Sequence, residues 1–139
     1  MSRFVIDASV VLSWCFPDEN SALAQHVADR FKRGDVAIAS AFWPHEVLNA
    51  LLAGEKRQRI SGLLVRSFLD DLAILPVELQ HSRAEAVFVR IQSLSRAHGL
   101  TAYDAAYLDL ALEGGLPLAT LDEDLIRASK RAGAKLLQP

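Results

Sequence analysis

The stretch Phe4-Val5-Ile6-Asp7-Ala8-Ser9, residues 4–9, places a short apolar run directly before an aspartate. Such a run, stopped by a polar residue, is typical of a buried β-strand. A carboxylate directly after a buried strand is costly unless something compensates its charge. Nearby in sequence only Arg3 is basic, and it precedes the run. Asp7 is therefore the first candidate for a functional residue.

Short apolar runs and longer helical patterns alternate along the rest of the chain. Further strands are expected at residues 36–39, 74–77 and 116–119, with a possible fifth at 134–137. Pro76 limits the strand at 74–77 because proline has no backbone N–H to donate. Helices are expected at residues 20–33, 44–57, 61–72, 82–98, 101–114 and 122–131. This alternation predicts an α/β fold with a parallel sheet of four to five strands and right-handed crossovers.

Length and composition predict a single domain over residues 1–139. The chain is 51% hydrophobic with a net charge of −2, so it is neither disordered nor a polybasic nucleic-acid coat. The single cysteine, Cys15, excludes an internal disulfide and a zinc site built on a cysteine pair. No apolar run reaches the roughly 18–20 residues that cross a bilayer, and Asp7 interrupts the first run, unlike a secretory signal. We expect a soluble cytoplasmic protein with no membrane partner.

Four acidic residues follow predicted strands or begin predicted helices: Asp7, Glu46, Asp104 and Asp122. In a parallel sheet these places share one edge, and ligands bind beyond the carboxyl ends of the strands. Each residue, taken alone, is also explained as a helix cap, because carboxylates accept bonds from the first N–H groups of a helix.

Several carboxylates at one edge repel each other, and a divalent cation relieves that repulsion. Mg²⁺ prefers oxygen ligands and keeps several waters while a few carboxylates bind it. Such a site suits phosphoryl chemistry, because a bound metal lowers the pKa of water and stabilises the reacting oxygens.

Four segments, in this order and spacing, resemble those of PIN-domain proteins, and most of all the VapC toxins of type II toxin–antitoxin systems. They are Val5-Ile6-Asp7-Ala8-Ser9, Pro44-His45-Glu46-Val47-Leu48-Asn49-Ala50, Leu100-Thr101-Ala102-Tyr103-Asp104-Ala105-Ala106-Tyr107 and Leu118-Ala119-Thr120-Leu121-Asp122-Glu123-Asp124-Leu125. Any one of them is a weak signal, whereas the ordered set spans essentially the whole chain.

The resemblance implies a three-layer α/β/α sandwich and a Mg²⁺-dependent endoribonuclease in which Mn²⁺ can substitute. It places catalysis and metal binding on Asp7, Glu46, Asp104 and Asp122, with Ser9, Thr120 and Asp124 at supporting positions. It also implies an RNA substrate, a VapB-type antitoxin that covers the site, a homodimer and possible higher toxin–antitoxin assemblies. The apolar helices at residues 44–72 are candidates for the dimer or antitoxin surface.

Two groups of basic residues are candidates for RNA phosphate contacts, although charge runs are more often solvated helix faces. They comprise Lys56, Arg57, Arg59 and Arg66 in the first group, and Arg127, Lys130, Arg131 and Lys135 in the second. Aromatic residues near the motifs can stack on bases, but burial is the stronger expectation for them. They are Trp14, Phe16, Phe42 and Trp43.

Other functions remain open on the sequence alone. A haloacid-dehalogenase-type phosphatase needs a second acid two residues after Asp7, where Ser9 stands, and a receiver domain needs an acidic pair there. A PIN-fold module that binds RNA without cutting it is an alternative, although all four carboxylates are present. A PIN nuclease that acts on DNA or in RNA maturation is another.

Overall fold

The computed structural model describes residues 2–19 and 21–139, and its centre is a parallel four-stranded sheet. The strands are β1 (Arg3–Ile6), β2 (Val36–Ser40), β3 (Val77–Gln80) and β4 (Leu118–Ala119), in the order β3-β2-β1-β4. The first strand is central, and its register pairs Val5 with both Ile38 and Leu118. The predicted α/β class and parallel sheet are therefore confirmed.

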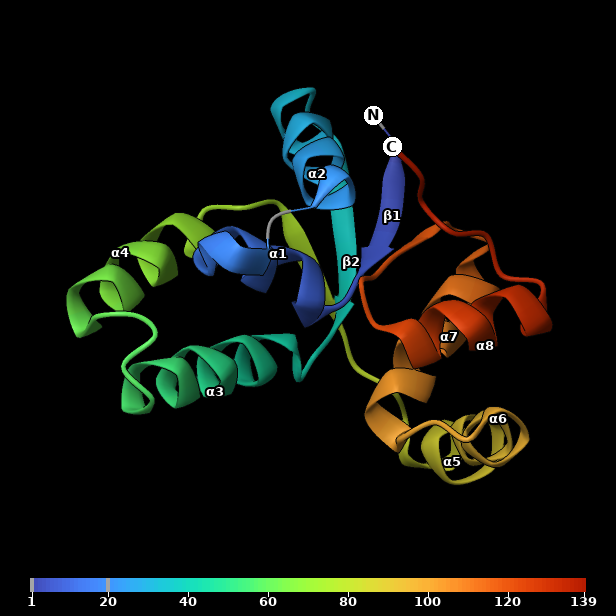
Figure 1. The fold of residues 1–139 in the computed structure, drawn as a ribbon. Coiled ribbons are helices and arrows are strands. Elements are labelled where there is room, and N and C mark those ends of the chain that lie inside the picture. Colours follow the sequence, from blue (N-terminus) through green and yellow to red (C-terminus); the bar gives the residue numbers. More distant parts are fainter. Residues whose placement is uncertain (1, 20) are drawn as a thin grey trace.

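Helices cover both faces of the sheet in three layers, as the family resemblance implied (Figure 1). Their bounds are α1 (Ala8–Cys15), η1 (Pro17–Glu19), α2 (Ala22–Lys32), α3 (Trp43–Lys56), α4 (Gly62–Ala73), α5 (Ala84–Ala86), η2 (Val87–Ile91), α6 (Gln92–His98), α7 (Ala102–Gly114) and α8 (Glu123–Ala132). Figure 1 shows α1, α3 and α4 on one side of β1 and β2, and α7, α8 and the α5–α6 segment on the other. This layering buries β1 and leaves its carboxyl end at the junction between the two helical layers.

The core lies where α1 and α7 press on the sheet. Phe4, Val5 and Ile6 of β1 have no exposed surface, nor do Tyr107 and Leu108 of α7. Cys15 is buried as well, and its burial raises the thiol pKa to about 12, so it stays a neutral core residue. In residues 2–19 and 21–139, no helix has the length and apolar character needed to cross a membrane.

Helix α1 is the largest feature that the sequence did not predict. We expected the next helix after Asp7 only at residue 20, yet α1 starts at Ala8. Asp7 itself causes this early start, because its side chain accepts a hydrogen bond from the Ser9 backbone N–H at 3.0 Å and caps the helix. The sequence pattern did not indicate a helix here, because Val10 and Val11 are β-branched and have low helix propensity. The helix after it, α2, begins at Ala22, and Asn20 lies outside the described residues.

Several further bounds differ from the sequence expectation, and one of them is the fourth strand, which begins at Leu118 and not at residue 116. The third strand begins at Val77, after Pro76 and not before it, although the Pro76 carbonyl accepts from the Ala37 N–H at 3.0 Å. The C-terminal run forms a single parallel bridge from Leu136 to Leu118 in place of a fifth strand. The helix predicted at residues 82–98 starts at Ala84 and contains the π-helical segment η2 at its centre.

Candidate active site

Asp7 sits at the carboxyl end of β1 and is held by three hydrogen bonds. Its Oδ1 accepts from the Ser9 backbone N–H at 3.0 Å and from the Ser9 hydroxyl at 2.6 Å, and its Oδ2 accepts from the Thr120 hydroxyl at 2.5 Å. A carboxylate offers about four acceptor positions, so roughly one is left for a further ligand. The side chain is 5% exposed. The Asp7 carboxylate is thus fixed in place before any ligand arrives.

The two hydroxyls that hold Asp7 also hold the loop that follows β4. The Ser9 hydroxyl accepts from the Leu121 N–H at 2.8 Å, and the Thr120 hydroxyl accepts from the Asp122 N–H at 3.0 Å. Each hydroxyl therefore donates to Asp7 and accepts from the chain near Asp122. Ser9 and Thr120, which the sequence placed at supporting positions, join the first and last acidic motifs.

Glu46 lies in the first turn of α3 and is half-buried. The buried hydroxyl of Tyr107 donates to its Oε1 at 2.6 Å. The two residues are 61 positions apart, and they join the helices on opposite sides of the sheet. Tyr107 therefore orients Glu46 from the facing layer.

Asp104 and Asp122 both stand at helix starts. The Thr101 hydroxyl accepts from the Asp104 N–H at 3.1 Å, and Asp122 caps α8 by accepting from the Leu125 N–H at 2.9 Å. The capping interpretation is thus correct for Asp7 and Asp122. Capping also fixes where these carboxylates lie, so it does not compete with a role in the site.

The electrostatics link the four carboxylates through Asp104. Burial raises the pKa of Asp7 to about 7, against the effect of its three hydrogen bonds and with a contribution from the Asp104 charge. Burial also raises the pKa of Glu46, where Asp104 again adds to the rise and Tyr107 opposes it. The pKa of Asp104 is raised by burial and by the charges of Asp122 and Asp124. The edge therefore concentrates negative charge that the protein's own cations do not neutralise.

These carboxylates offer the donor chemistry of a hard divalent cation. All four predicted ligands supply carboxylate oxygens. In three of them, Asp7, Glu46 and Asp104, burial and neighbouring negative charge raise the pKa. Among residues 2–19 and 21–139, no three His, Cys, Asp or Glu side chains stand close enough together to enclose a metal. The arrangement is an open acidic edge, which suits an ion such as Mg²⁺ that retains several waters.

The basic residues named from the sequence differ in whether they pair with carboxylates of this chain. Arg59 is engaged within the protein, because it pairs with Asp18 and Glu19 at 3.1 Å and lies 4.4 Å from the centre of the Phe16 ring. Arg127 pairs with Asp124. Both arginines therefore pair with carboxylates of this chain, and Asp124 is engaged by Arg127.

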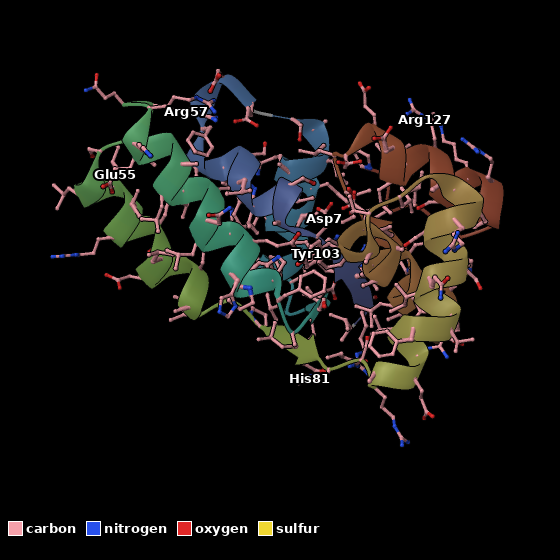
Figure 2. The ribbon with its side chains drawn as sticks, turned by 90° about the horizontal axis from the view of Figure 1, so that it is seen from below. Asp7, Glu55, Arg57, His81, Tyr103 and Arg127 are labelled. Atoms are coloured by element: carbon pink, nitrogen blue, oxygen red, sulfur yellow. The ribbon has the colours of Figure 1, made fainter. Side chains whose placement is uncertain are left out.

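Exposed basic side chains lie at the far ends of the two helices that begin near Glu46 and Asp122. Lys56 and Arg57 are exposed at the end of α3, and Lys130 and Arg131 are exposed in the last turn of α8. Figure 2 shows Arg57 on one side of Asp7 and Arg127 on the other. Positive charge is therefore available on both sides of the carboxylates.

Two aromatic residues belong to the site although neither was assigned to it from the sequence. Tyr107 was noted only as part of a motif, but a tyrosine with no exposed surface needs a hydrogen-bond partner for its hydroxyl. Its position three residues after Asp104, on the same helix face, was the available signal. Trp43 was expected in the core, where it is, and its indole N–H also donates to the Asp7 backbone carbonyl at 3.2 Å.

Comparison with known proteins agrees with this fold. The PIN domain family model matches residues 4–131. The chain is 32% identical over 129 residues to Ribonuclease VapC3 from Pyrobaculum aerophilum, covering 88% of this chain and 92% of that protein. The crystal structure of PAE2754, also from Pyrobaculum aerophilum, superposes with a TM-score of 0.62 at 18% identity, over 91% of this chain and 84% of that one, and so supports the fold. The chain therefore belongs to the PIN-domain family, on its VapC branch.

Proposed function

We propose that this chain is an endoribonuclease that hydrolyses RNA phosphodiester bonds with the help of Mg²⁺ or Mn²⁺. The observation that supports the proposal is electrostatic: the Asp104 charge raises the pKa of Asp7 and of Glu46, and the Asp122 charge raises the pKa of Asp104. The 32% identity to a protein named as a ribonuclease supports RNA as the substrate.

The four carboxylates are the residues that would hold the ion. When bound, a divalent cation supplies a water of lowered pKa and offsets charge on the phosphate oxygens. Asp7 brings a carboxylate fixed by Ser9 and Thr120, so little side-chain freedom is lost when a ligand binds. Glu46, oriented by Tyr107, stands ready to accept a proton from an attacking water or to act as a further ligand.

The proposal needs a path for the RNA backbone, and the exposed cations supply one. Arg57, at the end of α3, lies on one side of Asp7, and Arg127 of α8 lies on the other (Figure 2). Phosphates held at these side chains would lead the strand across Asp7.

We further propose that the protein is a VapC-type toxin that a VapB-type antitoxin neutralises, and that it forms a homodimer. Exposed leucines on α3 and α4 support a protein contact: Leu48, Leu52, Leu63 and Leu64. Scattered apolar residues are common on surfaces, but four on two adjacent helices form a patch suited to a partner. Light scattering of the purified chain, alone and co-expressed with the neighbouring small gene product, tests both statements.

The test of the activity is cleavage of a structured RNA pool with Mg²⁺, with Mn²⁺ and with EDTA. Wild type, Asp7→Asn and Asp71→Asn are compared, since Asp71 is an exposed carboxylate on α4, away from the edge. We expect metal-dependent cleavage by wild type and Asp71→Asn, and none by Asp7→Asn. Equal cleavage by all three refutes the site. Wild type that binds the pool but leaves RNA and DNA intact refutes the activity and favours a non-catalytic RNA-binding module.

A further inference from the structure

A cavity of about 530 Å³ opens beside the acidic edge. Its volume lies in the range of small-molecule sites. Its lining comes from α3, η2, α7 and the segments after β2 and β3, and includes Phe42, His45, His81, Ser82, Val87 and Tyr103. None of these residues has a part in the metal chemistry proposed above.

An aromatic pair forms one wall of this cavity. The rings of Phe42 and Tyr103 meet edge to face, with centres 5.0 Å apart. Tyr103 is 60% exposed, which is a large exposed fraction for an aromatic side chain. Behind it, Ile91 and Ala106 are almost fully buried and close the floor. The cavity thus combines an apolar base with an accessible aromatic ring.

The rim of the cavity is polar. His45 in the first turn of α3, together with His81 and Ser82 after β3, supplies two imidazoles and a hydroxyl. Each of these groups can both donate and accept hydrogen bonds. A nucleobase carries the matching features, a flat face that stacks on aromatic rings and an edge of donors and acceptors. An apolar protein side chain would use only the wall and the floor.

Two residues that line the cavity are sequence neighbours of the candidate carboxylates. Tyr103 directly precedes Asp104, and His45 directly precedes Glu46. Phe42 packs on Tyr107 with ring centres 5.6 Å apart, and the Tyr107 hydroxyl donates to Glu46. In Figure 2, Tyr103 lies between Asp7 and His81. The π-helical segment η2, which contributes Val87 and Ile91, is a feature that is frequent at functional sites.

We propose that this cavity binds one unpaired nucleobase of the RNA, next to the phosphate that is cut. Tyr103 stacks on the base, and His45, His81 and Ser82 contact its edge. The proposal rests on the function proposed above and makes the enzyme specific for a single-stranded or splayed nucleotide. In this proposal the cavity selects the substrate, and the carboxylates carry out the hydrolysis.

The experiment measures RNA binding in EDTA, where cleavage does not interfere. The probes are a fluorescein-labelled decamer of adenosine and uridine, and a decamer of abasic ribose phosphates with the same charge. Wild type is compared with Tyr103→Leu, which removes the ring, and Tyr103→Phe, which keeps it. Phe88→Leu is the matched control, because Phe88 is an exposed aromatic residue that does not line the cavity. Circular dichroism checks that each variant is folded.

Loss of one stacked base is expected to weaken decamer binding by Tyr103→Leu by roughly tenfold. Tyr103→Phe and Phe88→Leu should bind like wild type, and the abasic decamer should bind all four proteins equally weakly. Unchanged decamer affinity in Tyr103→Leu overturns the proposal, as does wild type that does not distinguish the two probes. If Tyr103→Leu keeps its RNA affinity and loses a co-expressed antitoxin, the cavity is a protein site instead. Wild type that binds bases in this way but never cleaves RNA refutes the proposed activity and leaves the base site standing.

Discussion

At the scale of single residues, Asp7 is an ionisable group in a place where burial disfavours its charged form. The carboxylate ends a strand with no exposed surface, and three hydrogen bonds only partly offset its burial. Its pKa of about 7 means that the folded protein without a cation holds a proton there well above the pH at which an unfolded aspartate loses it. The residue that begins α1 is therefore also the one most dependent on a ligand.

This raised pKa predicts a pH-dependent stability. The folded state binds the Asp7 proton more tightly than the unfolded state, so stability falls as pH rises from about 4 to about 7. In EDTA, wild type should lose about 2–3 kcal/mol of unfolding free energy between pH 5 and pH 8 through this group. Asp7→Asn should lack that loss, because an asparagine side chain does not titrate between pH 5 and pH 8. Urea unfolding of both proteins at both pH values measures the difference, and parallel pH profiles would contradict it.

Tyr107 is a positioning residue, and its removal should change Glu46 without unfolding the protein. Tyr107→Phe deletes only the hydroxyl that donates to Glu46, so we expect a stability cost of about 1–2 kcal/mol. Because this hydrogen bond lowers the pKa of Glu46, that pKa should rise further in the variant. Carboxyl ¹³C NMR titration of Glu46 measures the shift.

Tyr103→Phe is the control for that titration, since the Tyr103 side chain is exposed and does not contribute to the pKa of Glu46. A Glu46 titration curve that is the same in Tyr107→Phe as in wild type would show that the tyrosine does not act on the carboxylate. Mn²⁺ affinity, measured in parallel, reports whether the orientation of Glu46 matters for the ion.

At the scale of elements, α3 packs against the segment after α1 through a glycine. A Cβ at Gly54 would stand 2.7 Å from the Phe16 ring, which itself lies under Arg59. Gly54→Ala must therefore displace a buried ring or the helix, at a cost of about 1–3 kcal/mol. Gly62→Ala is the matched control, because its Cβ meets only the flexible Glu55 side chain at 3.2 Å and helix propensity favours alanine.

Thermal unfolding of the two glycine variants measures this packing. We expect a lowered Tm for Gly54→Ala and an equal or raised Tm for Gly62→Ala. Equal Tm values for both would mean that α3 does not pack as closely on Phe16 as the structure has it.

The elements also show what local sequence can and cannot predict. The caps at Ser61, Thr101 and Asp122 were predictable, because a hydroxyl or carboxylate before an apolar periodic run satisfies the first N–H groups of a helix. Helix α1 was not, since the valines at its centre favour a strand when burial is ignored. The π-helical segment η2 has no local signature, because its hydrogen-bond pattern depends on packing against α7.

At the scale of the whole molecule, residues far apart in sequence meet at one sheet edge. Thr120 donates to Asp7 across 113 positions, and Tyr107 donates to Glu46 across 61. Parallel topology made the shared edge predictable, and with it the four candidate carboxylates. The supporting positions of Ser9 and Thr120 came from the family resemblance. The partners of Arg59 and the cavity beside Tyr103 depend on tertiary packing that the sequence pattern does not show. The pair of Arg127 with Asp124 is different, because the two residues are three positions apart in α8 and their spacing could have predicted it.

The exposed cations of α8 carry a prediction about the whole surface. Lys130→Ala with Arg131→Ala should weaken RNA binding and reduce the log–log slope of its salt dependence by about 0.7 for each phosphate that is no longer neutralised. Lys32→Ala is the control, because Lys32 is exposed at the end of α2, next to the start of β2 at the opposite sheet edge. Fluorescence anisotropy across a salt series measures the slopes. A slope unchanged from wild type in the double variant would exclude these two residues from the RNA path.

The location of bound Mn²⁺ tests whether the four carboxylates form a divalent-cation site. Crystals of wild type and of Asp7→Asn soaked in Mn²⁺ would locate the ion by its anomalous scattering. We expect a peak among Asp7, Glu46, Asp104 and Asp122 in wild type, and a weaker peak or none in Asp7→Asn. A peak of equal height in both proteins, or one only at other carboxylates such as Asp71, would contradict the metal site.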